Sequence, residues 1–217
     1  MGIKAKISAV VFVILALSCN SLQATLITIE IAAEIAEVYD ISGLLEGNVN
    51  VGDTITGSYT YDSTTPDSNP LETVGDYWHF SSPYGISLSV GGFVFQTDPD
   101  NVNFLVSVGN NHLGDDNYLL RSYYNLPLSN GVWVEHISWH LVDYSATALS
   151  STDLPTTPPV LEDWESIGGI TIRYGPKGSS MIRAHVDSAV PEPGTVFLLG
   201  LGSLTLIRRR KFAAGRS

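Results

Sequence analysis

Apolar and polar side chains alternate along most of the chain between residues 25 and 189. The clearest case lies near the start of this region, where every second residue from Ile27 to Ile35 is apolar and most of the intervening residues are polar. A repeat of two residues is typical of a β-strand with one buried face. Ile31, Ile35 and Val38 would also fit one side of a helix, so a strand is the favoured interpretation and a helix is the alternative.

Eight further segments continue the strand pattern. In residues 54–62, Ile55, Tyr59 and Tyr61 fall on one face. Two of the later segments are separated only by Gly91-Gly92, which is a strong signal for a two-residue β-hairpin. The later segments are residues 86–90, 93–97, 102–108, 118–124, 132–143, 169–174 and 181–186.

These features predict an all-β domain of about nine strands that covers residues 25–189. Turn-forming residues separate the segments, and nothing between the two ends of the chain keeps a sustained helical repeat. Such a pattern favours a β-sandwich or a jelly roll. The proline-rich residues 151–164 cannot form a central strand. We expect them to wrap the domain as a long connection, held by Leu154, Leu161 and Trp164.

The first 24 residues have the layout of a secretory signal peptide. Lys4 and Lys6 precede an apolar run over residues 7–17, and Ala24 offers a small residue at the expected cleavage point. Cys19 is the only cysteine, and the residues before it are in the wrong order for lipid attachment. Because Cys19 leaves with the signal peptide, the mature domain is expected to have no disulfide and no thiol chemistry.

The C-terminal residues 190–217 form a second targeting segment. Pro191, Glu192 and Pro193 precede an uncharged run over residues 195–207, and four cations follow that run directly: Arg208, Arg209, Arg210 and Lys211. Basic residues beside a membrane segment stay in the cytoplasm, so residues 195–207 are interpreted as a short transmembrane helix. The run is shorter than the usual 20 residues or so of a full span, and a strand or helix buried in the domain is the alternative.

This order of Pro-Glu-Pro, apolar helix and basic block resembles the PEP-CTERM sorting signal of biofilm-forming Gram-negative bacteria. The resemblance implies that an exosortase-like membrane protease or transpeptidase recognises Pro191, Glu192 and Pro193. It also implies that the Arg/Lys block acts as a stop-transfer signal. The precursor would be anchored in the inner membrane and then reach the cell surface or the extracellular matrix. Residues 57–62 and 153–155 are similar, more loosely, to uncharacterised secreted β-domains that precede such signals.

Charge is distributed unevenly between the domain and its tail. Residues 25–190 contain 21 Asp and Glu against four cations, which leaves a net charge of −17. A surface of this sign repels nucleic acids and anionic phospholipids, so we expect no nucleic-acid partner. The same surface would attract Ca²⁺ or simply remain solvated.

His136 and His140 are the first candidates for a metal site, because two imidazoles four residues apart share one side of a helix. The surrounding residues instead indicate a strand, with Val134, His136 and His140 on one face and Trp133 and Trp139 on the other. The two imidazoles would then lie roughly 13 Å apart, too far to share one ion. The interpretation is two solvent-facing histidines and no metal site.

Two acidic segments and a set of aromatic residues are candidates for ligand binding. Residues 98–103 and 115–117 offer the oxygen ligands that Ca²⁺ takes, although Asp and Asn are also common in turns. Aromatic side chains could stack on sugar rings, although strand aromatics are more often buried. The aromatic candidates are Trp78, Tyr84, Trp133, Trp139 and Trp164.

The sequence contains no nucleophile elbow, P-loop or dinucleotide fingerprint, and no catalytic residue is assigned. The favoured hypothesis is a non-enzymatic surface or exopolysaccharide-associated protein. The alternative is a carbohydrate-binding or calcium-binding module. Two weaker alternatives are an ice-binding protein, for which Thr54, Thr56 and Thr60 form too short a row, and a hydrolase.

Overall fold

Ten β-strands and two short 3-10 helices make up the domain. The computed structural model describes residues 26–165 and 169–192. The strands are β1 Leu26–Tyr39, β2 Thr54–Asp62, β3 Val74–His79, β4 Gly85–Val90, β5 Phe93–Gln96, β6 Phe104–His112, β7 Asp115–Ser122, β8 Val134–Asp143, β9 Ile170–Tyr174 and β10 Ser180–Pro191. The 3-10 helices are η1 Leu161–Asp163 and η2 Pro176–Gly178. The predicted signal peptide, residues 195–207 and residues 208–211 lie outside the described residues.

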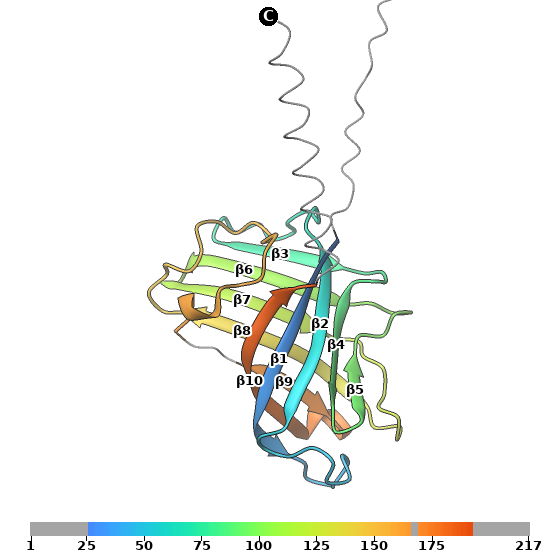
Figure 1. The fold of residues 1–217 in the computed structure, drawn as a ribbon. Helices are drawn as coiled ribbons and strands as arrows, with labels where there is room; N and C mark the ends of the chain where they lie inside the picture. Colours follow the sequence, from blue (N-terminus) through green and yellow to red (C-terminus); the bar gives the residue numbers. More distant parts are fainter. Residues whose placement is uncertain (1–25, 166–168, 193–217) are drawn as a thin grey trace, which may run out of the picture.

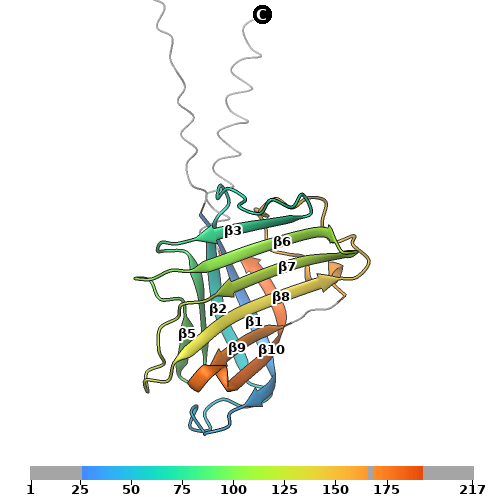
Figure 2. The ribbon, with the colours of Figure 1, turned by 180° about the vertical axis from the view of Figure 1, so that it is seen from behind.

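All ten strands belong to one antiparallel sheet, in the order β3-β6-β7-β8-β9-β10-β1-β2-β4-β5. The sheet curls strongly, so that β10, β1 and β2 lie across β6, β7 and β8 (Figures 1 and 2). The predicted all-β class is therefore confirmed. The predicted β-sandwich or jelly roll would have two separate sheets. The structure instead has a single sheet, whose two halves pack against each other.

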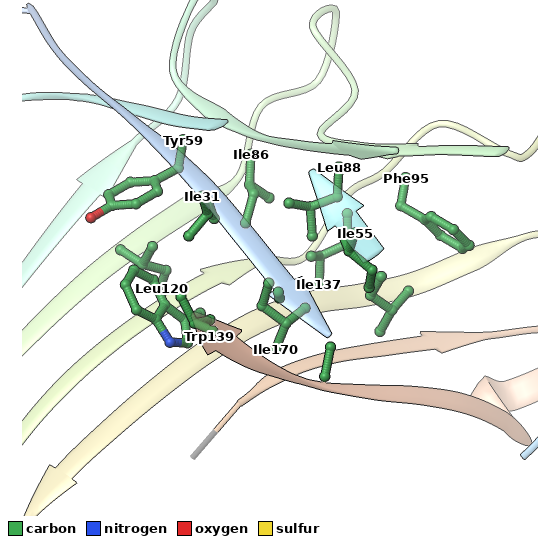
Figure 3. Packing of buried hydrophobic residues seen from close by; sticks show 14 of the residues in the cluster. Ile31, Ile55, Tyr59, Ile86, Leu88, Phe95, Leu120, Ile137, Trp139 and Ile170 are labelled. Atoms are coloured by element: carbon green, nitrogen blue, oxygen red, sulfur yellow. The ribbon is translucent and has the colours of Figure 1, made fainter. Parts of the chain in front are cut away.

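The core lies between these two halves. Figure 3 shows Tyr59, Ile55 and Leu88 from one half facing Leu120, Ile137 and Trp139 from the other. The ring of Tyr59 in β2 meets the edge of Trp139 in β8 at a centroid distance of 5.8 Å. Because fully burying one large apolar side chain contributes about 1.5–3 kcal/mol, these contacts across the halves stabilise the curled form of the sheet.

The sequence pattern located β1 and the β4–β5 hairpin correctly. Every second residue from Ile27 to Ile35 is at most 3% exposed, and the segment is a strand, so the helical alternative is wrong. Gly91 and Gly92 join β4 and β5 with φ angles of 57° and 81°. Positive φ at both positions is what a two-residue hairpin turn requires, and glycine adopts it without strain.

Two local predictions were wrong. Strand β3 was not expected, because its inward positions hold Gly75, Tyr77 and His79 rather than aliphatic residues. In β8, the pairing with β9 shifts between Val134 and His136. This β-bulge turns Val134 into the core, where it is fully buried, and leaves Trp133, ahead of the strand, 52% exposed.

The proline-rich connection behaves as expected. The hydroxyl of Tyr61 donates to the carbonyl of Pro155 at 2.6 Å, and the hydroxyl of Tyr77 donates to the carbonyl of Thr152 at 2.7 Å. Leu154 and Trp164 are buried, and Leu161 packs partly against the core. Strand hydroxyls and apolar side chains together hold this connection against the sheet.

Candidate functional site

The start of the predicted sorting signal belongs to the sheet. Strand β10 lies between β9 and β1 and continues to Pro191, which is paired with Ile29. The backbone amide of Glu192 then donates to the carbonyl of Thr28 at 3.0 Å, while the Glu192 side chain is exposed. Pro193, the third residue of the predicted motif, lies outside the described residues. The first two residues of Pro-Glu-Pro are therefore held by the backbone of β1.

Residues 195–207, the predicted transmembrane helix, are not among the described residues. Within residues 26–165 and 169–192, no helix is long and apolar enough to cross a membrane.

An exposed aromatic stack lies at the β3 edge of the sheet. The rings of Trp78 and Phe80 are nearly parallel, with 5° between their planes and 6.1 Å between centroids. The Tyr123 ring also stacks with Trp78, with 5.6 Å between centroids, and the guanidinium of Arg121 lies 5.8 Å from the Tyr123 ring. Phe80 is 69% exposed. Sequence reasoning selected Trp78 alone: it missed the strand that precedes Phe80, and Tyr123 comes from a segment that only the fold brings to Trp78.

The other aromatic candidates do not join this stack. Trp139 and Trp164 are buried in the core, and Trp133 is exposed. Tyr84 packs edge-on against His79 at 4.9 Å. Of the five aromatic residues selected from the sequence, only Trp78 contributes to an exposed stack of rings.

The histidines of β8 point to the outer face of the sheet, as predicted. His136 is half-buried and His140 is exposed, and His140 Nε2 lies 3.0 Å from Asn117 Oδ1. Burial lowers the pKa of both imidazoles, and the positive charge of Arg121 lowers both further. Among the described residues, no three His, Cys, Asp or Glu side chains are grouped so that they could hold a metal ion.

The acidic segment at residues 115–117 does not form a turn. It begins strand β7, and Asp116 is fully buried. Its two carboxylate oxygens accept the amides of Asn111 at 2.7 Å and Leu149 at 2.8 Å. Asp98, in the other acidic segment, accepts the amide of Asp100 at 3.0 Å.

Asp116 is paired across the strands with a second buried carboxylate, Asp143. Asp143 accepts bonds from the hydroxyl of Ser145 and the amide of Thr147. These bonds hold the pKa of Asp143 well below its usual range, and the bond from the Ser145 hydroxyl has the largest effect. Since backbone amides and hydroxyls already occupy both carboxylates, this pair organises the loops next to β7 and β8 and is not arranged for acid–base catalysis.

The arrangement defines a class of protein: an all-β domain whose last strand runs directly into a C-terminal targeting segment. Residues 189–211 match the PEP-CTERM protein-sorting motif. The chain therefore carries the signal that marks exported proteins for sorting at the membrane or cell surface by exosortase. No curated protein and no solved structure matches the chain.

Proposed function

We propose that the protein is a non-enzymatic component of the cell surface or of the exopolysaccharide matrix, delivered there by exosortase. Residues 1–24 direct export, and residues 195–207 hold the precursor in the inner membrane. The exosortase-like enzyme recognises Pro191, Glu192 and Pro193. The block of Arg208, Arg209, Arg210 and Lys211 stops transfer and remains in the cytoplasm.

The observation that carries this proposal is the match of residues 189–211 to the sorting motif. The position of that motif in the fold supports it, because β10 ends at Pro191. Cleavage on the C-terminal side of Glu192 would leave all ten described strands and the Glu192–Thr28 hydrogen bond in place. The processed product would therefore keep the complete sheet.

The test is the intact mass of the protein recovered from the envelope and the medium of its native host. We expect a mass that ends near residues 191–194, with or without an added group. Replacing Pro191, Glu192 and Pro193 together by alanine should leave the unprocessed mass in the membrane fraction. Replacing Pro158 and Pro159 by alanine provides the matched control and should not alter processing. Recovery of a product that still contains residues 208–217 from the wild-type cells would refute the proposal.

A carbohydrate-binding role is the second candidate function, and the stack of Phe80, Trp78 and Tyr123 favours it. Titration calorimetry with neutral and acidic glycans tests this role directly. Titration with Ca²⁺ tests the calcium-binding alternative, and a panel of chromogenic glycosides and esters tests for hydrolase activity.

A further inference from the structure

The cations of the domain are gathered on one side of the sheet. Residues 26–165 and 169–192 contain 22 acidic side chains and only four Lys or Arg. Arg121 on β7, Arg173 on β9 and Arg183 on β10 all project from the outer face. Lys177 lies in η2, the turn whose Gly178 carbonyl faces Arg173. His136, His140 and His185 lie on the same face. The few cations of a strongly acidic domain thus lie on one face, among outward carboxylates such as Asp187.

One row of side chains crosses this face from strand to strand. Its members are successive cross-strand partners, which therefore point to the same side of the sheet: Trp78, Leu105, Arg121, Ser138, Thr171 and Arg183. Five strand spacings give the row a length of roughly 24 Å. The row begins at the aromatic stack. It ends in a groove of about 460 Å³ whose lining includes His140, Thr171, Arg183 and His185.

Arg121, in the middle of the row, is not neutralised by the surrounding residues. Its Nε is buried without a hydrogen-bond partner among the described residues, and its guanidinium makes no ion pair within them. Arg183 is different, because it lies 3.4 Å from Glu37, with both side chains about half exposed. Such exposed pairs contribute little and are easily exchanged for another partner. Other carboxylates share this face: Asp76 on β3, Asp115 on β7 and Asp187 on β10 occupy outward positions, and the charge of Glu135 acts on His136.

From this geometry we propose that the outer face of β3, β6, β7, β8, β9 and β10 binds an acidic polysaccharide, one whose sugars carry carboxylates. Phe80, Trp78 and Tyr123 receive the apolar faces of sugar rings. The planar guanidinium of Arg121 receives a carboxylate through two parallel hydrogen bonds. This proposal rests on the proposed function, because residence in the matrix is what brings the face to such a polymer.

The combination of groups selects this partner over others. A neutral glycan would use the aromatic stack but would leave Arg121 without an acceptor. A nucleic acid requires several cations to neutralise its closely spaced phosphates, and the surrounding domain is strongly acidic. An acidic surface on a second copy of this chain could pair with the cations, but it would not use the aromatic stack. A glycan with separated carboxylates uses both features.

The test is calorimetric titration of the full-length protein, purified in mild detergent, with oligogalacturonate at low salt. Dextran serves as the neutral glycan. We expect binding of oligogalacturonate that weakens as salt is added, and no binding of dextran. Arg121→Gln and Trp78→Ala should each raise the dissociation constant roughly tenfold or more, as expected for loss of a charge-assisted bond or a stacking surface.

Two matched variants control for general effects. Trp133→Ala removes an exposed tryptophan outside the row, and Val51→Glu adds one negative charge in the turn between β1 and β2. Both should bind like the wild type. The proposal is overturned if oligogalacturonate does not bind, if dextran binds equally, or if Arg121→Gln and Trp78→Ala bind normally while folded. It is also overturned if Arg121→Gln alters only self-association measured by sedimentation. The intact-mass experiment is independent of every one of these outcomes.

Discussion

At the scale of single residues, His79 is a buried polar side chain whose two ring nitrogens both have hydrogen-bond partners. His79, at the end of β3, is 3% exposed. Its Nε2 accepts the backbone amide of Asp62 at 3.1 Å, and its Nδ1 lies 3.2 Å from the carbonyl of Tyr77. An acceptor at Nε2 and a donor at Nδ1 require the neutral imidazole. His79 therefore joins the ends of β2 and β3 only while it is uncharged.

This requirement predicts a pH dependence of stability. Burial lowers the pKa of His79 in the folded protein, whereas the unfolded chain has a value near 6.5. Above about pH 6.5 neither state binds the proton, so the stabilisation is fully present. As the pH falls below that value the unfolded state binds a proton that the folded state resists. The free energy of unfolding then falls, by up to about 1.4 kcal/mol per pH unit, until the folded pKa is reached.

Urea denaturation at pH 7 and pH 5 measures this loss, with His79→Gln as the comparison. The variant should be less stable at pH 7 and should lose less stability between the two pH values. His136 and His140 are present in both proteins, so their contributions cancel in the difference. Equal losses in wild type and variant would show that folding does not lower the pKa of His79.

At the scale of the elements, the bulge in β8 decides which tryptophan is structural. Simple alternation assigned Trp133 and Trp139 to one face. The register shift beyond Val134 buries Trp139 completely, between Tyr59 and Tyr118, and leaves Trp133 exposed. Trp139→Ala should therefore lower the free energy of unfolding by about 3–5 kcal/mol. Trp133→Ala should change it by less than about 0.5 kcal/mol.

Urea titration followed by circular dichroism measures both variants on one scale. The pair is matched, because each loses one indole from the same part of the chain. Similar losses in the two variants would contradict the placement of the bulge.

Alternation along the sequence was sufficient to predict the all-β class, the buried positions of β1 and the Gly91-Gly92 hairpin. It missed β3, where Gly75, Tyr77 and His79 point inward while Trp78 points outward. The bulge in β8 and the joining of all strands into one sheet depend on register between distant segments, which periodicity does not encode. The aromatic stack is of the same kind, since Trp78 meets Tyr123 only through the pairing of β3, β6 and β7. The sorting motif was recognisable because its residues are contiguous.

At the scale of the whole molecule, the sorting motif and the proposed binding face belong to one curled sheet. Its last strand ends within the residues that match the sorting motif. The outer face of β7, β9 and β10, with the adjoining turn η2, carries the four cations of the described residues. The sorting motif begins at the end of β10, whereas the proposed binding groups Trp78 and Arg121 lie on β3 and β7, so loss of one proposed function need not impair the other.

The acidic surface also predicts how the domain responds to salt. With a net charge near −17 over residues 25–190, like charges repel one another more strongly in the compact state than in the expanded unfolded chain. Raising the ionic strength from about 0.01 M to about 0.15 M shortens the screening length from about 30 Å to about 8 Å. Since the one ion pair among the described residues is exposed, screening should relieve more repulsion than it removes attraction.

The midpoint of thermal unfolding should therefore rise by several degrees when KCl is added, and sucrose at equal osmolality separates this effect from general solute exclusion. A midpoint that falls with KCl would mean that attraction between the four cations and the surrounding carboxylates outweighs the repulsion, so that electrostatic interactions on balance stabilise the fold.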